Sequence, residues 1–231
     1  MQFVDPALRA TPGSYYGPGS GIEACITALR RARPGGLRIG VVGMGAASLA
    51  AYAGAGDDLT FYEIDPDVVR LARKWFTFWD DAEARGAKVA VEIGDARLVL
   101  DRGNPEPYDL LVVDAFSGDA IPVHLLTSEC FALYRRRLAE GGLIAAHVSN
   151  LFLHLAPVVR AQAEQLGMGA ANLASPPDPA RIGFANDWVA VSADSALIEA
   201  IGSRGIAAAW PAVEHARPWT DDSSSLLPLL K

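Results

Sequence analysis

Residues 37–45 read LRIGVVGMG, and this stretch decides the class of fold. Its first six residues are mostly apolar and include three β-branched side chains, as expected of a buried strand. Gly43 and Gly45 follow at once, and an alanine-rich stretch comes after them. A strand that passes through a glycine turn into a helix is the first unit of nucleotide-binding α/β folds. We therefore expect a strand at 37–42 followed by an Ala-rich helix.

The alternation of strand and helix continues along the chain. Further strands are predicted at short apolar, β-branched runs, namely 58–64, 88–93, 109–113 and 143–148. Helices are predicted over about 22–33, from Pro66 onward, over about 128–138 and up to about 166. The runs 170–174 and 188–192 have only a proline-rich loop between them, so an antiparallel pair at the sheet edge is expected. The predicted class is α/β, with a doubly wound, mostly parallel, Rossmann-like sheet.

Three segments are predicted along this chain. Residues 1–34 form a Gly/Pro-rich arm and a short helix, which the sequence Pro-Gly-Gly at 34–36 ends. Residues 35–195 form the nucleoside-binding core, and residues 196–231 form a C-terminal extension.

Composition and charge restrict the expected partners and location. The formal net charge is −7, with 20 Lys and Arg against 27 acidic residues, whereas a nucleic-acid ligand normally needs a basic face. The cluster Arg135–Arg137 ends a predicted helix, where cations complement the helix dipole. No apolar run approaches the ~20 residues of a membrane helix, and the first residues do not resemble a secretory signal. We expect a cytoplasmic protein that binds no nucleic acid.

Cysteines and histidines show no metal-binding pattern. Cys25 and Cys130 lie far apart among apolar neighbours, which is typical of small core residues. The histidines at positions 124, 147, 154 and 215 also lack the spacing of a ligand set. No metal site is expected.

An acidic residue lies at or just after the end of each of three successive predicted strands, namely Glu63, Asp95 and Asp114. The carboxyl ends of parallel strands meet at one edge of the sheet, where ligands bind, so we expect these acids around one cleft with Gly43 and Gly45. There, Glu63 could accept hydrogen bonds from both ribose hydroxyls of a nucleoside, and Asp95 from an adenine amino group. Taken singly, the glycines also fit a tight turn and Asp95 also fits a helix cap.

The nucleoside expected here carries no phosphate. The third glycine of a dinucleotide-binding motif is replaced by Ala47 or Ser48, depending on the alignment. Acids after the third and fourth strands suit adenosine without a phosphate, so S-adenosylmethionine is favoured over NAD.

Several motifs resemble the spermidine synthase (polyamine aminopropyltransferase) family. They are VVGMG at 41–45, FYEIDP at 61–66, GDAR at 94–97 and DLLVVDAFSGD at 109–119. The runs DAIPVHLLT at 119–127 and WTDD at 219–222 are similar to a bacterial spermidine-synthase-like branch often fused behind transporter segments. The likeness covers nearly the whole chain from about Tyr15 onward. The Gly-x-Gly element is shared with class I methyltransferases that use S-adenosylmethionine, and their type of fold is implied.

This resemblance implies a role for each residue of the site. The implied contacts of S-adenosylmethionine, or of its decarboxylated form, are Gly43, Gly45, Glu63, Asp95 and Ala96. Asp114 and Tyr16 are implied to orient and deprotonate an attacking amine, which would be a small-molecule acceptor. Further candidate substrate contacts are Tyr15, Asp119, His147 and Asn150, of which the last two equally fit a satisfied loop pair. A homodimer is also implied.

The chain departs from the family pattern at several positions. Ala46 stands where family members carry an Asp that grips the aminopropyl amine, and Gly17 follows the arm tyrosine in place of Gln or His. Asp114 and Asp119 are five residues apart instead of three, and the family's N-terminal β-domain is reduced to a short arm. A methyltransferase on the same fold therefore remains an alternative. A non-catalytic nucleoside-binding or dimerisation module is a third hypothesis.

Two further segments each have two interpretations. The aromatic side chains at 75, 76, 78 and 79 favour packing against the sheet or a subunit interface over stacking on a substrate. The segment Thr-Asp-Asp at 220–222 fits either a lid on the site or the cap of a short terminal helix.

Overall fold

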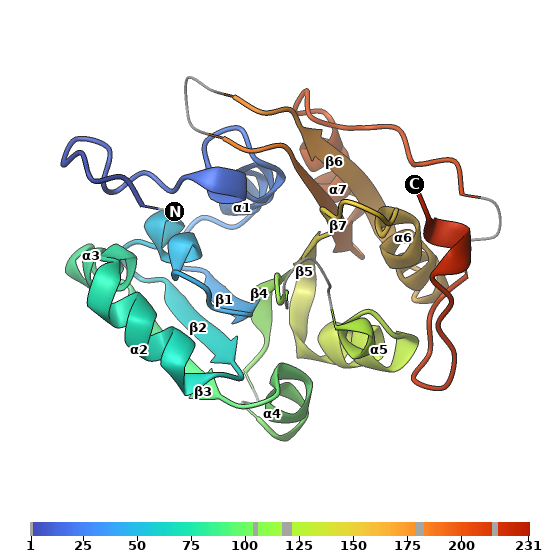
Figure 1. Cartoon of the computed structure of the whole chain (residues 1–231), viewed down its shortest axis with the longest axis horizontal. Coiled ribbons are helices and arrows are strands. Elements are labelled where there is room, and N and C mark those ends of the chain that lie inside the picture. Colours follow the sequence, from blue (N-terminus) through green and yellow to red (C-terminus); the bar gives the residue numbers. More distant parts are fainter. Residues whose placement is uncertain (1, 104–105, 117–121, 179–182, 214–216) are drawn as a thin grey trace.

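A seven-stranded sheet with helices on both faces forms the molecule (Figure 1). The computed structural model describes residues 2–103, 106–116, 122–178, 183–213 and 217–231. The strand order is β3-β2-β1-β4-β5-β7-β6. The strands are β1 (Arg38–Val42), β2 (Asp58–Glu63), β3 (Lys88–Ile93), β4 (Tyr108–Val113), β5 (Leu138–His147), β6 (Gly169–Ser175) and β7 (Asn186–Ser192).

The predicted class of fold is confirmed. Strands β1 to β5 pair in parallel, while β7 lies antiparallel to both β5 and β6. The two strands expected at the edge therefore form the antiparallel pair that the missing helix between them indicates. The connection from β6 to β7 needs no crossover, because antiparallel neighbours can be joined by a loop.

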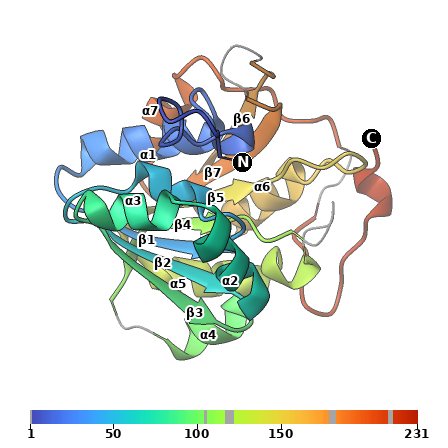
Figure 2. The same ribbon diagram turned by 60° about the vertical axis from the view of Figure 1, so that its left-hand side comes forward.

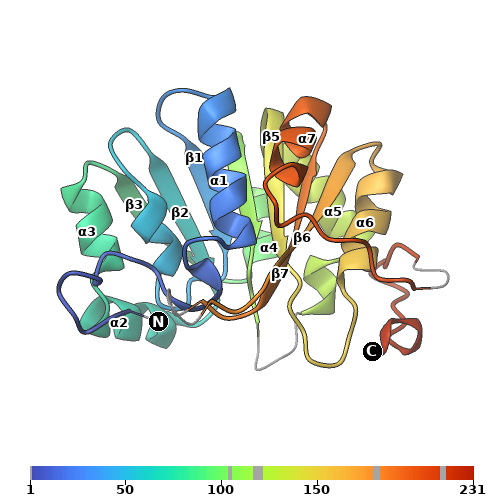
Figure 3. The same ribbon diagram turned by 90° about the horizontal axis from the view of Figure 1, so that it is seen from above.

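Helices cover the two faces of the sheet in two groups (Figures 2 and 3). One core cluster contains side chains of α1 (Gly21–Ala32), α2 (Pro66–Trp75), α3 (Phe78–Ala84) and α7 (Ser195–Gly202). The opposite cluster contains side chains of α4 (Ala96–Arg102), α5 (Ser128–Arg137) and α6 (Ala156–Gln165). Cys25 is buried in the first cluster and Cys130 in the second, as small core residues.

The central strand β4 explains why the site can lie at one edge of a rigid sheet. Four consecutive side chains, from Leu110 to Val113, are buried, and they alternate between the two core clusters. A strand covered on both faces reads as a continuous apolar run, which is how β4 reads in the sequence. The residue after this run, Asp114, is therefore held at a fixed position beyond the strand end.

The prediction of an Ala-rich α-helix after β1 is wrong. In its place lies η2 (Ser48–Tyr52), a five-residue 3-10 helix that begins after Ala47. Ala47 has a φ of 57°, a left-handed conformation that cannot continue an α-helix. A segment this short provides no aligned α-helical dipole, so any ligand at this turn meets individual backbone N–H groups.

The aromatic side chains at 75, 76, 78 and 79 contribute mainly to core packing. Phe78 is buried, and Phe76 and Trp79 pack partly buried against the first core cluster, whereas Trp75 is exposed. None of these side chains lines the cavity described below. In the described residues, no helix is both long and apolar enough to cross a lipid bilayer.

Candidate functional site

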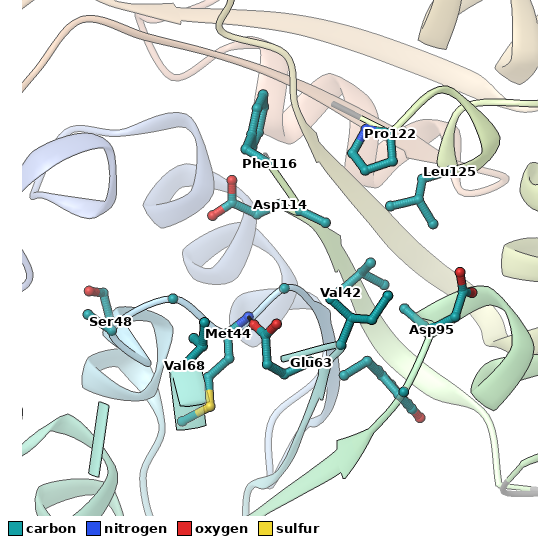
Figure 4. A pocket seen from close by; sticks show the side chains of 18 of the residues that line it. Val42, Met44, Ser48, Glu63, Val68, Asp95, Asp114, Phe116, Pro122 and Leu125 are labelled. Atoms are coloured by element: carbon teal, nitrogen blue, oxygen red, sulfur yellow. Dashed lines mark hydrogen bonds between the residues drawn. The ribbon is translucent and has the colours of Figure 1, made fainter. Parts of the chain in front are cut away.

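A cavity of about 360 Å³ lies at the carboxyl ends of β1 to β4 (Figure 4). This volume is in the range typical of small-molecule sites. Its walls are built by the arm, by the turns after the four strands and by the segment before α5. Its described lining residues include Ser14, Tyr15, Tyr16, Val42, Gly43, Met44, Gly45, Ala46, Ser48, Tyr62, Glu63, Ile64, Val68, Gly94, Asp95, Ala96, Asp114, Ala115, Phe116, Pro122, His124 and Leu125.

Strand order reverses between β1 and β4, and Gly43 and Asp114 flank this point. Gly43 has a φ of +92°, and a Cβ atom there would lie 2.5 Å from the carbonyl oxygen of Asp114. A glycine is therefore required for the two turns to pass this close. The Asp114 amide donates to the Val42 carbonyl oxygen at 2.9 Å, which continues the strand ladder into the site.

Glu63 at the end of β2 ties the glycine turn to the next strand. Its Oε2 accepts a hydrogen bond from the Met44 amide at 3.0 Å, and its Oε1 accepts one from the Asp65 amide at 3.0 Å. The residue is 8% exposed, yet it lines the cavity. Each carboxylate oxygen has a second lone pair, so Glu63 could still accept hydrogen bonds from two hydroxyls of a ligand.

Asp95 lies at the next turn, beside Ala96, and both line the cavity. One oxygen of Asp95 caps α4 by accepting from the Leu98 amide at 3.1 Å, as the cap interpretation expects. The other oxygen lies 3.4 Å from Nε2 of His124, which comes from the segment before α5. Asp95 is thus both a helix cap and part of the cavity wall.

Asp114 is held by two side chains, one at each carboxylate oxygen. The Tyr16 hydroxyl donates to its Oδ2, and the His147 ring nitrogen Nδ1 lies 2.7 Å from its Oδ1. Burial raises the pKa of Tyr16 well above its ordinary value, and the nearby Asp114 charge adds to this effect. Tyr16 therefore stays protonated at neutral pH and acts as a donor toward Asp114.

The arm residues before α1 are fixed over the site by contacts with distant segments. The Tyr52 hydroxyl donates to the Tyr16 carbonyl oxygen at 2.5 Å, and the Phe184 amide donates to the Ser14 carbonyl oxygen at 3.4 Å. Tyr15 also lines the cavity, and its ring stacks on the ring of His147 with centroids 4.5 Å apart. Burial, and then the Asp114 charge, raises the pKa of Tyr15.

Two residues predicted as substrate contacts are not among the described lining residues of the cavity. His147 is 5% exposed and contacts Asp114 from the far side, without lining the cavity. Asn150 accepts hydrogen bonds from the Phe152 and Leu153 amides at 2.9 and 2.8 Å, and so shapes the loop after β5. Asp119, the remaining predicted contact, lies outside the described residues.

Several residues around the site were not found by sequence reasoning. Ser14, Phe116 and His124 line the cavity, and Ser149 lies 2.8 Å from His147 Nε2. Phe116 lies in the motif at 109–119 and His124 in the motif at 119–127, so the motifs could have indicated both residues as part of the site. Ser149 carries no local signal, because its role depends on the pairing of β5 with β7.

The cavity has a strongly acidic lining. Glu63, Asp95 and Asp114 line it, and none of its described lining residues is lysine or arginine. His124 is the one described lining side chain that could carry a positive charge. Such a lining favours a cationic ligand over an anionic one.

The acidic tail segment at 220–222 is neither a lid nor the cap of a terminal helix in the described structure. Asp221 forms a bidentate pair with Arg97 at 2.7 and 2.6 Å and accepts from the Thr127 hydroxyl at 2.8 Å. The Arg97 hydrogen bonds, and then that of Thr127, lower the pKa of Asp221 to about 2. The tail is thereby anchored to α4, next to Asp95 and outside the cavity.

Comparison with known proteins gives sequence relatives of two kinds, although no family model matches the chain. A polyamine aminopropyltransferase from Vibrio vulnificus is 32% identical over 127 residues, covering 51% of this chain and 40% of that protein. An N-terminal histidine N-methyltransferase from Emericella nidulans is 34% identical over 115 residues, covering 48% of this chain and 19% of that protein. The chain is similar to an aminopropyltransferase.

That similarity confirms the resemblance to spermidine synthases that the motifs indicate. Both matched relatives bear the names of group-transfer enzymes, and each match spans less than half of the relative. Among solved structures, a probable spermidine synthase from Corynebacterium glutamicum has a TM-score of 0.63 at 23% identity. This match covers 89% of the present chain and 80% of that structure, and it supports the assignment of the fold.

Proposed function

We propose that this chain is a spermidine-synthase-like transferase that moves an aminopropyl or related group to an amine acceptor. The donor would be S-adenosylmethionine or its decarboxylated form, with the decarboxylated form preferred. The observation that carries the proposal is the Asp114 carboxylate, whose side chain is 5% exposed, which Tyr16 holds at the switch point of the sheet and which lines the cavity.

The chemistry that this arrangement supports is the deprotonation of an amine. A primary amine is protonated at neutral pH and cannot attack carbon until it loses a proton. Asp114 would bind the ammonium group and accept its proton, while Tyr16 holds the carboxylate in place. A new N–C bond then forms as a C–S bond breaks, and the electron pair of that bond goes to the sulfonium, which leaves as a neutral thioether.

Residues on the other side of the cavity support adenosine binding. Glu63 would accept from the ribose hydroxyls with the lone pairs that its backbone partners leave free, and Asp95 would accept from the adenine amino group. Gly43, Gly45 and Ala96 present no bulky side chain, so a ligand can approach the backbone there. Positioning of this kind supplies much of the rate, because a sulfonium is already a good leaving group.

The charge of the lining supports the decarboxylated donor. Intact S-adenosylmethionine carries a carboxylate, which would enter a cavity that presents three acids and, among its described residues, no lysine or arginine. The decarboxylated form lacks this anion and has a higher net positive charge.

Methyl transfer is the second candidate, and one residue favours it. Ala46 lines the cavity where an acid would grip the aminopropyl amine, so that amine has no carboxylate at this position. Backbone N–H groups around Gly45 and Ala46 could instead receive the methionine carboxylate. The similarity to a histidine N-methyltransferase is consistent with this alternative.

Isothermal titration of the purified chain with the two donors tests the proposal. We expect both to bind, with the decarboxylated form tighter by about 10-fold or more because no carboxylate opposes the acidic lining. Tighter binding of intact S-adenosylmethionine would favour methyl transfer. If neither compound bound, the adenosine site itself would be refuted.

A further inference from the structure

Behind Asp114, on the side away from the cavity, lies a chain of hydrogen bonds. His147 Nδ1 lies 2.7 Å from Asp114 Oδ1, and His147 Nε2 lies 2.8 Å from the Ser149 hydroxyl oxygen. The Asp187 amide donates to the same hydroxyl oxygen at 2.8 Å. This series of hydrogen bonds thus begins at a backbone amide of β7 and ends at Asp114, the proposed base for the amine.

The direction of each hydrogen bond follows from what each group can donate. The Asp187 amide can only donate, so it occupies one lone pair of the Ser149 oxygen. Among the described residues the Ser149 hydroxyl has no other acceptor than His147 Nε2, so it donates to that nitrogen. His147 Nδ1 then carries the ring proton and donates it to the Asp114 carboxylate.

Packing fixes the imidazole ring of His147 in this orientation. Its ring lies between Tyr15 and Trp188, with centroids 4.5 and 4.7 Å away and interplanar angles of 24° and 23°. Phe116 contacts it edge-on at 5.0 Å. The two stacks hold the plane of the ring, and a 180° flip within that plane would break both hydrogen bonds, so the Nδ1–H group points at Asp114.

The hydrogen-bonded series of a serine, a histidine and an aspartate resembles a hydrolase triad. It differs from such a triad in which of its ends faces the cavity. Ser149 does not line the cavity, and its oxygen is already engaged by the Asp187 amide. The residue at the cavity end is Asp114. The reacting group is therefore the acid, and the serine is the remote end.

We propose that His147 and Ser149 are positioning residues that orient the carboxylate of Asp114 for proton transfer. This inference rests on the proposed function. His147 holds Oδ1 while Tyr16 holds Oδ2, so the remaining lone pairs of both oxygens face the attacking amine. Ser149 keeps the histidine in the Nδ1–H tautomer. Neither residue touches the substrate, and neither contributes to the binding of the donor.

Nuclear magnetic resonance of the imidazole nitrogens tests the chain of hydrogen bonds independently of any activity. In the 15N-labelled protein at neutral pH, we expect His147 Nδ1 to be protonated and Nε2 to be unprotonated. Ser149→Ala should shift the Nε2 resonance and mix the two tautomers. Protonation of Nε2 in the wild-type protein would overturn the inference.

Turnover of a decarboxylated donor with an amine tests the positioning role. His147→Phe preserves a stacking ring but removes the donor, and should lower kcat by roughly 10- to 100-fold while the donor Kd is unchanged. His147→Asn, whose amide can replace the Nδ1–H group, should recover part of this loss. Ser149→Ala should lower kcat less than His147→Phe does.

Ser192→Ala is the matched control for Ser149→Ala. Ser192 also accepts from an amide, that of Asp194 at 3.1 Å, and donates to the Gly142 carbonyl oxygen at 2.8 Å, at the opposite end of β7. The Ser192→Ala variant should keep the wild-type kcat. Unchanged kcat in both His147→Phe and Ser149→Ala would also overturn the inference. If the wild-type chain shows no turnover but the Nδ1–H tautomer is present, the proposed function fails while the hydrogen-bond chain stands.

Discussion

Replacing Asp114 by asparagine is expected to lower kcat by roughly 10²- to 10⁴-fold, the usual contribution of a positioned general base. The substitution keeps the size of the side chain but removes the negative charge that binds the ammonium group and accepts its proton. Because Glu63 and Asp95 hold the adenosine part, the Kd of the donor should change little. Steady-state kinetics with a saturating donor, together with titration of the donor, measures both quantities.

Asp101→Asn provides the control for the loss of one negative charge. Asp101 lies on α4, its side chain is 64% exposed, and it forms a surface pair with Arg136. Such exposed pairs contribute little, so this variant should keep wild-type kcat and Kd. If Asp114→Asn retained wild-type kcat, Asp114 would not be the base and the proposed chemistry would be wrong.

Glu63→Gln should have its main effect on the binding of the donor. The neutral amide replaces a carboxylate that would accept from both ribose hydroxyls, and hydrogen bonds to a charged group are each worth about 1.5–3 kcal/mol. We expect the Kd of either donor to rise by about 10- to 100-fold. Thermal unfolding should also occur at a lower temperature, because the Met44 and Asp65 amides lose a charged acceptor.

Glu92→Gln is the control for the loss of one negative charge near the strand ends without loss of a ligand contact. Glu92 lies on β3, one residue before the strand end, and its side chain does not line the cavity. Its substitution should leave the donor Kd unchanged. An unchanged Kd in Glu63→Gln would show that ribose hydroxyls are not recognised at this strand end.

The strand ends were predictable from the sequence because their geometry is set by the sheet. Once β1 to β4 are known to be parallel, the residues that follow them must meet at one edge, and Glu63, Asp95 and Asp114 all line the cavity there. The antiparallel edge pair was predictable for a related reason, since a loop without a helix cannot make a parallel crossover.

Other features depend on contacts between distant segments and had no local signal. The helix expected after β1 is replaced by a short 3-10 segment because Ala47 adopts a left-handed conformation, which an alanine rarely does. His147 was a candidate substrate contact, yet the pairing of β5 with β7 places it between Tyr15 and Trp188. The arm tyrosine was assigned to Asp114 from family resemblance alone, since 98 residues separate the two.

Identification of the nucleoside co-product formed from the decarboxylated donor and a diamine shows which group the chain transfers. Transfer of the aminopropyl group breaks the bond between sulfur and that chain, so mass spectrometry should find methylthioadenosine together with an amine enlarged by one aminopropyl unit. Asp114→Asn should form neither at an appreciable rate. A methylated acceptor with S-adenosylhomocysteine as the co-product, obtained from the intact donor alone, would contradict aminopropyl transfer.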